Sequence, residues 1–285
     1  MIESFLNSWE LFQRSYLAGW LLAVLLSMVG VMVVARDQIF IGAAVSQAST
    51  LGIVAAMWAA SLAPFRELHW MESEEFLSAC AVAASVMAAL VTSGRREAGR
   101  ESHESTTGWV FLLCASFSVL LASRSAHGLE EVQRLLSSSL IGAHWGDVAL
   151  FAGLTLAVGG FLMAFRRRAL LVLTDEEMAQ AVGIRTSLWN HGFSCLLGLT
   201  VGLSLRTAGM LYTFGCLVLP CLAARNLCRR SLPVLILGPI VGLAASVFSF
   251  VLANHYDQPP GQMAVAVLCV LVGITSILRK AGRVA

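Results

Sequence analysis

Few side chains in this chain have the types and spacing that metal or catalytic chemistry requires. His255 and Asp257 could ligate a transition metal through imidazole and carboxylate groups, but they stand alone on a turn closed by Pro259. Two ligands on a proline turn make an incomplete site, so docking of another molecule or plain turn formation is the favoured interpretation. The sequence has no G-x-x-x-x-G-K-[ST] phosphate loop, and any nucleotide hydrolysis therefore belongs to a partner.

His191 is a further candidate metal ligand, because an imidazole near the end of an apolar segment is a functional candidate by default. Its place near the predicted membrane interface favours hydration, or pairing with Asp175 or Glu176, over metal binding. The seven cysteines lie in or beside apolar runs without a C-x-x-C pair, which indicates small core side chains and not disulfides or metal ligands. They are Cys80, Cys114, Cys195, Cys216, Cys221, Cys228 and Cys269.

The polar stretch 166–185 lies between two long apolar runs and opens with three consecutive arginines. Such a cluster commonly follows a membrane span on its cytoplasmic side. Thr174 and Glu177 have the spacing of a capping box and Gly183 suits a C-cap, so the pattern predicts a short capped helix. A capped helix in a cytoplasmic loop is either a connector or a docking element, and its pattern alone does not distinguish these.

The elements that carry these residues are predicted to be membrane spans. Of the 285 residues, 58% are hydrophobic and 13% are charged, against about a quarter charged in soluble domains. A span needs about 20 mainly apolar residues, which gives eight or nine transmembrane helices in a single all-α domain over residues 1–285. The stretch 124–146 is ambiguous between a loop and a segment that dips into the bilayer. The candidate spans are 15–35, 41–62, 75–93, 107–123, 147–165, 186–206, 209–228, 232–253 and 262–279.

The basic residues predict the orientation of these spans. With nine spans and an outside N-terminus, fourteen of the 19 Lys and Arg residues fall on the cytoplasmic side, which is a clear positive-inside bias. The cytoplasmic set is Arg36, Arg95, Arg96, Arg100, Arg166, Arg167, Arg168, Arg185, Arg225, Arg229, Arg230, Arg279, Lys280 and Arg283; the outside set is Arg14, Arg66, Arg124, Arg134 and Arg206. An eight-span version with one re-entrant segment keeps most of this bias.

Four separated stretches resemble the ABC-type manganese/zinc/iron permease family over nearly the whole chain. The run Asp175-Glu176-x-x-Ala179-x-x-x-Gly183 is similar to the family's cytoplasmic motif. Stretches that begin at Ile41 and Arg206, the latter with Pro220, and the turn 255–261 are similar to three further motifs. The resemblance implies that Asp175, Glu176, Ala179 and Gly183 belong to a coupling helix for an ATPase subunit. It implies a pathway role for Pro220, and binding-protein docking for His255, Asp257 and Pro259.

The resemblance fails at two positions that matter for metal. After the first span, Ile41, Gly42, Ala44, Ser46 and Ala48 match the family signature, but Ala43 stands where the family has aspartate and Gln47 where it has histidine. In the family these two residues coordinate metal in the translocation pathway. Alanine has no donor atom and the glutamine amide is a weak ligand. Ala43, Ser46 and Gln47 therefore remain pathway candidates, while the intramembrane metal site is expected to be missing from this chain.

The resemblance implies a multi-pass subunit of an ATP-driven importer in a bacterial inner membrane, itself not an enzyme and with no bound cofactor. Its expected partners are cytoplasmic ATPase subunits that use ATP and Mg²⁺, an extracytoplasmic solute-binding protein, membrane lipid, and a second permease subunit, identical or non-identical; no nucleic acid is expected. Alternatives are a permease for a non-metal or chelated-metal substrate, an ATP-independent secondary transporter or channel, and a scaffold. Ion-coupled transport is disfavoured because acidic and imidazole groups occur only near the span ends, as with Asp147.

Overall fold

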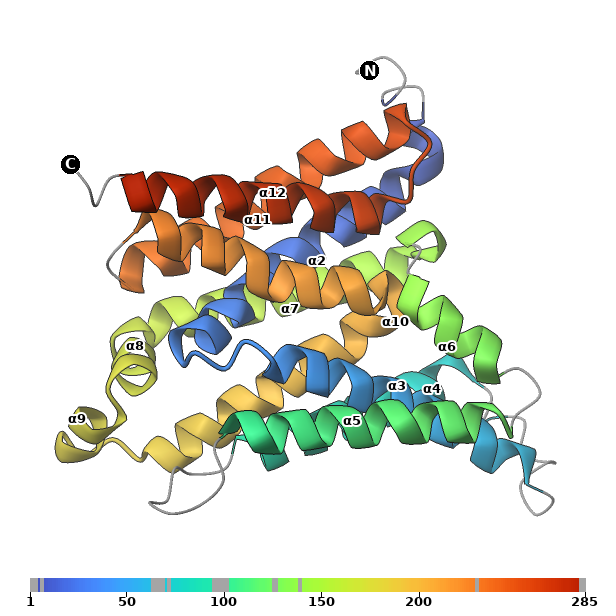
Figure 1. Ribbon diagram of the computed structural model, residues 1–285, viewed down its shortest axis with the longest axis horizontal. Helices are drawn as coiled ribbons and strands as arrows, with labels where there is room; N and C mark the ends of the chain where they lie inside the picture. The colour runs from blue at the N-terminus through green and yellow to red at the C-terminus, as the bar shows by residue number, and fades with distance from the viewer. Residues whose placement is uncertain are drawn as a thin grey trace. The chain divides into compact units, whose positions relative to one another are not determined.

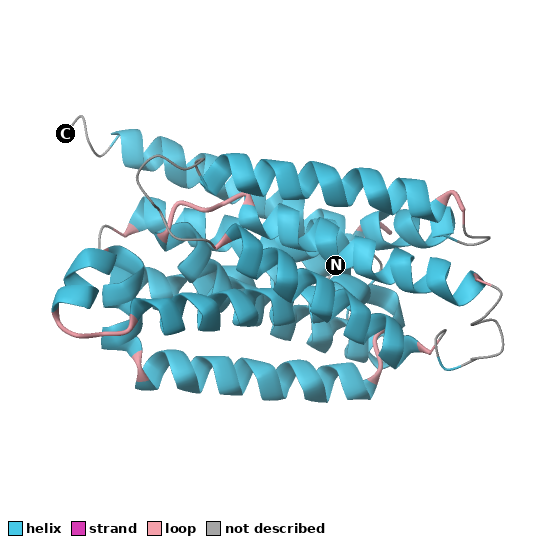
Figure 2. Cartoon of the chain, turned by 90° about the horizontal axis from the view of Figure 1, so that it is seen from below, coloured by secondary structure: helices cyan, strands magenta, loops and turns pink. Residues whose placement is uncertain are grey.

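The computed structural model describes residues 5, 8–62, 70, 73–93, 103–124, 128–137, 140–228 and 231–281. In these residues all regular structure is helical, and no strand occurs among them (Figure 2). The chain, predicted as a single domain, contains two compact units. Unit 1 comprises Met1–Asp37, Ser138–Thr186 and Leu211–Ala285, and unit 2 comprises Gln38–Ser137 and Ser187–Met210.

Unit 1 is built around α2, whose middle and C-terminal parts are almost wholly buried. α2 packs against α7 and α11, and α11 packs against α12 (Figure 1). Contact with the later part of α10 is very close, because a Cβ added to Gly30 would overlap the carbonyl oxygen of Leu217. The helices of this unit are α2 (Trp9–Ala35), η3 (Leu140–Gly142), α7 (Trp145–Ala164), α8 (Arg166–Thr174), α9 (Glu176–Ala181), the later part of α10 (Thr186–Leu227), α11 (Ser231–His255) and α12 (Pro260–Ala281).

Unit 2 is built around α3, which packs against α4 and α5. The early part of α10 approaches α4 closely, because a Cβ added to Gly198 would overlap the backbone of Val86. The Ser85 hydroxyl donates a hydrogen bond of 2.6 Å to the Gly198 carbonyl oxygen at the same crossing. The helices of this unit are α3 (Ile41–Ser61), α4 (Glu74–Thr92), α5 (His103–Ala122), α6 (Gly128–Ser137) and the early part of α10.

Eight of the described helices are long and apolar enough to cross a membrane. One of them, α10, has 42 residues. An unbroken helix of that length would extend for about 63 Å, roughly twice the hydrocarbon core of a bilayer. At Gly209 the backbone leaves the helical region, with φ of 75° and ψ of 171°. This break divides α10 into two span-length segments, which agree with the predicted spans 186–206 and 209–228.

The ambiguous stretch 124–146 contains no further spanning helix among its described residues. It holds the ten-residue helix α6 and the single turn η3 before α7 begins at Trp145. α6 is amphipathic, with Val132 and Leu135 buried and Leu129 exposed. Ten helical residues extend for about 15 Å, which is half of what a span requires.

The membrane orientation is a prediction that accessible cysteines can test. Of the basic residues behind it, Arg66, Arg95, Arg96, Arg100, Arg229, Arg230 and Arg283 lie outside the described residues. Gln180 and Gln258 are both exposed. In a background without the seven natural cysteines, Gln180→Cys should react with a membrane-impermeant maleimide only from the cytoplasmic side and Gln258→Cys only from the outside. A permeant maleimide should label both variants, and labelling of both from one side by the impermeant reagent would contradict the predicted topology.

Candidate functional site

The short helix predicted in the polar stretch is α9, although its cap differs from the prediction. Thr174 belongs to the preceding helix α8, where its hydroxyl donates to the Leu170 carbonyl oxygen at 2.8 Å. The N-cap is Asp175, whose carboxylate accepts the Met178 amide at 2.9 Å. The predicted Thr174–Glu177 capping box is therefore wrong. Both Thr and Asp are good caps, and the place where α8 ends decides which one serves.

The C-terminal end of α9 depends on Gly183, as predicted. Gly183 has a φ of +86°, in the left-handed region that glycine adopts without steric cost. The Ile184 amide donates to the Ala179 carbonyl oxygen and the Gly183 amide to that of Gln180, each at 2.9 Å. These two bonds form the Schellman arrangement that ends many helices. A side chain at this position would strain the backbone that closes α9.

One side chain of α9 is buried, whereas two apolar side chains, one in the helix and one at its C-cap, are exposed to solvent. Ala179 is completely buried, whereas Met178 and Val182 are 55% and 66% exposed. Met178 lies in α9 and Val182 is its C-cap, and the Val182 backbone amide donates to the Met178 carbonyl oxygen at 3.1 Å, so the two side chains lie on one face. Exposed apolar side chains on a capped, charged helix suit insertion into a pocket of another protein. Sequence reasoning missed these two residues, although apolar residues at spacing four inside a polar stretch were a usable signal.

On α3, Ala43 and Gln47 are half-buried while the neighbouring positions 44–46 and 48–50 are buried. This places the two positions, four residues apart, on the less covered face of the helix, and their pathway role stays a prediction. The side-chain amide of Gln47 lies 3.2 Å from the sulfur of Met210 on α10. An amide and a thioether, both neutral, therefore occupy the position where the resembled family has an imidazole.

The hydroxyl groups near this face do not complete a cation site. Ser46 is buried and donates to the Gly42 carbonyl oxygen at 2.8 Å, and Thr50 donates to the Ser46 carbonyl oxygen at 3.2 Å. Both hydroxyls are therefore turned back onto their own helix. Among the described residues, no group of three or more His, Cys, Asp or Glu side chains could hold a metal ion.

Pro220 lies in the buried later part of α10 and cannot donate a backbone hydrogen bond. The carbonyl oxygen that this leaves free is that of Cys216. The hydroxyl of Ser27 on α2, which donates to its own Ala23 carbonyl oxygen at 2.5 Å, lies 3.3 Å from it. Pro220 thus has a polar group of α2 beside the carbonyl oxygen it leaves free inside unit 1, and its pathway role stays a prediction.

His191 lies on α10 and is exposed. Its Nδ1 atom lies 2.6 Å from the carbonyl oxygen of Ser187, one helical turn earlier. An acceptor at that distance means that Nδ1 carries the proton and donates to the helix backbone, which occupies this ring nitrogen with a local bond.

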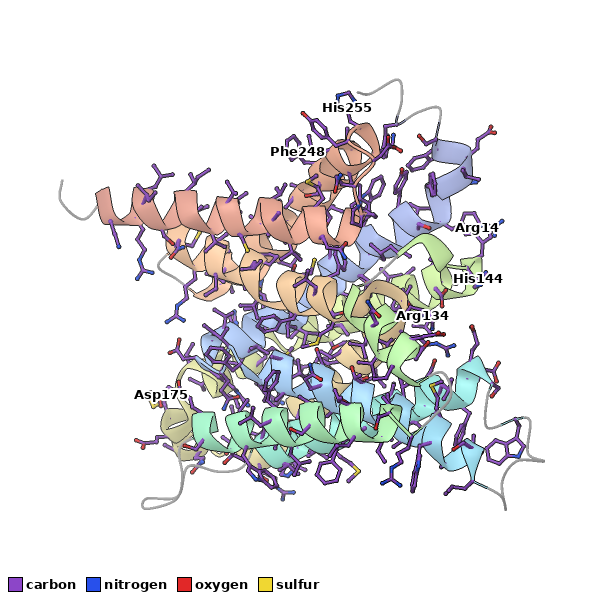
Figure 3. The ribbon with its side chains drawn as sticks, turned by 45° about the vertical axis from the view of Figure 1, so that its right-hand side comes forward. Arg14, Arg134, His144, Asp175, Phe248 and His255 are labelled. Atoms are coloured by element: carbon purple, nitrogen blue, oxygen red, sulfur yellow. The ribbon has the colours of Figure 1, made fainter. Side chains whose placement is uncertain are left out.

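The predicted docking turn follows α11. His255, Asp257 and Pro259 are all exposed, and the His255 ring packs edge-on against Tyr256 with centroids 5.0 Å apart. Asp257 has a φ of +51°. The backbone amide of Gln258 donates a hydrogen bond of 2.9 Å to the Ala253 carbonyl oxygen, which closes the turn. Figure 3 shows that Asp175 and His255 lie at opposite ends of unit 1, so α9 and this turn can serve two different partners.

Comparisons with known proteins agree with these features. The model of the ABC 3 transport family matches residues 8–279. The chelated iron transport system membrane protein YfeD of Yersinia pestis is 24% identical over 259 residues, which cover 90% of this chain and 81% of the relative. The manganese transport system membrane protein MntC of Halalkalibacterium halodurans is 23% identical over 269 residues, which cover 94% of this chain and 87% of the relative.

Among solved structures, PsaBC from Streptococcus pneumoniae in complex with Fab has the same fold. That likeness has a TM-score of 0.79 with 16% sequence identity, and it covers 96% of this chain and 95% of the other. A second structure, an inward-facing conformation of a putative metal-chelate type ABC transporter, has a TM-score of 0.69 with 17% identity over 92% of this chain and 84% of the other.

Proposed function

Because this chain belongs to the ABC 3 transport family, we propose that it is the membrane permease subunit of an ATP-driven importer for a divalent transition metal. The observation that carries the proposal is α9, a capped helix that presents Met178 and Val182 to solvent. A docked ATPase subunit would cover these two side chains and use ATP and Mg²⁺. The permease itself catalyses no reaction; it changes its access from one side of the membrane to the other.

Manganese and iron are the favoured cargoes, since two relatives are named for manganese and chelated iron transport. A bare divalent ion needs carboxylate or imidazole ligands, which Ala43 and the Gln47–Met210 pair do not supply. We therefore favour an assembly with a second, non-identical permease subunit that provides the ligands of a shared pathway. An extracytoplasmic binding protein would deliver the metal at the exposed turn of His255 and Asp257.

A second candidate function is transport of a chelated metal. The neutral pair of Gln47 and Met210 favours this alternative, because a metal that keeps its own ligands needs no charged group from the pathway. The form in which the metal is supplied separates the two functions: a chelate importer takes up metal given as a preformed, slowly exchanging chelate, whereas a bare-ion importer does not.

Reconstitution tests the proposal. The complex purified with its ATPase subunits should take up ⁵⁴Mn²⁺ or ⁵⁵Fe into proteoliposomes when ATP and the binding protein are present. A non-hydrolysable ATP analogue is the control and should give background uptake. Uptake driven by a proton or sodium gradient without the ATPase would overturn the proposal in favour of a secondary transporter.

A further inference from the structure

The residues that follow α2 make two different electrostatic contacts inside unit 1. Arg36 and Asp37 come directly after the helix, and Asp37 has a φ of +55°, which is uncommon for a residue other than glycine. The guanidinium of Arg225, near the end of α10, lies 2.5 Å from the Asp37 carboxylate. The same guanidinium donates to the Val34 carbonyl oxygen at 3.2 Å. Arg225 therefore holds both the last turn of α2 and the residue beyond it.

The ion pair of Arg225 and Asp37 is too exposed to exist for stability alone. The two side chains are 45% and 71% exposed, and water screens pairs of this kind until they contribute little to folding. A left-handed aspartate adds a small conformational cost. Together with the Arg225 bond to the Val34 carbonyl oxygen, the contact links the end of α10 to the end of α2.

The neighbouring residue extends this connection to α12. The amide of Asn226 donates to the hydroxyl groups of Thr275 and Ser276 at 3.3 and 2.9 Å. Its carbonyl oxygen accepts a bond of 3.2 Å from Arg279. The ends of α2, α10 and α12 are therefore joined by side chains of consecutive residues, Arg225 and Asn226.

The residues after α2 are also connected to α9, through Arg36. Arg36 is half-buried; burial lowers the pKa of its guanidinium, and the negative charge of Glu176 opposes this shift. Glu176 is the first residue of α9, and α8 before it packs against α2. In Figure 1, α8 and α9 lie at the same end of unit 1 as the C-terminal ends of α2 and α12.

We infer that Glu176, Arg36, Asp37 and Arg225 form a relay that transmits displacement of α9 to the end of α10. These four are positioning residues, and the inference rests on the proposed function of α9 as the ATPase contact. Arg36 is the C-cap of α2, and α8 contacts both α2 and α9, so displacement of α9 reaches Arg36 through this packing. Asp37 is the covalent neighbour of Arg36. Arg225 follows Asp37 and moves the α10 segment beyond Pro220, where one backbone hydrogen bond is already missing.

If the four residues act as a relay, removal of one of their charges should reduce coupling. A purely structural contact would not have this effect. Asp37→Asn keeps the shape of the side chain and removes its charge, and Arg225→Gln removes the other charge. In purified complexes with bound ATPase, we expect metal transported per ATP hydrolysed to fall about tenfold in each variant, within the usual range of coupling effects, while ATP hydrolysis continues. Arg225→Lys, which keeps the charge, should retain most of the coupling.

The control is an ion pair within a single helix, that of Arg134 and Glu131 on α6, with a separation of 2.8 Å; Arg134 is exposed and Glu131 is half-buried. Arg134→Gln should leave transport per ATP unchanged. The double variant Arg36→Glu with Glu176→Arg should transport more per ATP than either single variant, which a purely structural role does not require.

Transport per ATP and assembly with the ATPase are measured on the same preparations. Wild-type coupling in both Asp37→Asn and Arg225→Gln would overturn the relay, as would a loss of assembly without a change of coupling in the complexes that remain. The absence of ATP-dependent uptake by the wild-type complex would instead overturn the proposed function, so the two failures are distinguishable.

Discussion

Gly183→Trp is expected to abolish coupled transport while the protein still inserts into the membrane. Gly183 ends α9 in a left-handed conformation, and a side chain there costs about 1–2 kcal/mol for a residue other than glycine. No other described residue lies within 4 Å of a Cβ added at this position, so the indole would extend into the space that the ATPase is proposed to fill. We expect ATP-dependent uptake to fall about a hundredfold, at the upper end of measured coupling effects.

Gly183→Asn separates backbone strain from collision with the partner. Asparagine tolerates the left-handed region and has a small side chain, so this variant should keep most of the uptake. Binding of the ATPase to the detergent-solubilised permease gives a second measurement, which Gly183→Trp should weaken. Wild-type uptake by Gly183→Trp would remove α9 as the coupling element.

Removal of the carboxylate and imidazole ligands from the second permease subunit should abolish metal binding, whereas Gln47→Ala in this chain should reduce uptake only about twofold. The small effect follows because Gln47 makes a weak, neutral contact with the Met210 sulfur, which contributes roughly 0.5 kcal/mol. The large effect follows because each carboxylate or imidazole is a primary ligand for the metal. Metal bound per complex, measured by mass spectrometry after dialysis, checks the first expectation, and ATP-dependent uptake checks the second.

A variant of this chain in which the two missing ligands are restored should bind additional metal. Ala43 and Gln47 lie on one half-buried face of α3, so Ala43→Asp with Gln47→His restores the two ligands at the spacing of one helical turn. A complex that carries this pair of changes should bind more metal than wild type. If this chain instead forms a homodimer with undiminished metal affinity, the non-identical pair is wrong.

The amino-acid sequence by itself determined the membrane-spanning character of the chain and the position of nearly every span. Both follow from the length of the apolar runs, because each segment that crosses a bilayer must itself be long and apolar enough to do so. The sequence also predicted a short helix closed by Gly183, because helix ends depend on residues within a few positions of one another. It assigned the N-cap to Thr174 and not to Asp175, since both side chains can cap and only the end of α8 decides between them.

Tertiary structure alone decided which distant residues meet. Gln47 contacts Met210 and Asp37 pairs with Arg225, across 163 and 188 residues of sequence. No local pattern encodes such contacts, because they depend on how one helix packs against another. The same holds for the carbonyl oxygen freed by Pro220, which the sequence shows to be missing its donor. Only the packing of α2 against α10 places the hydroxyl of Ser27 within hydrogen-bonding distance of it.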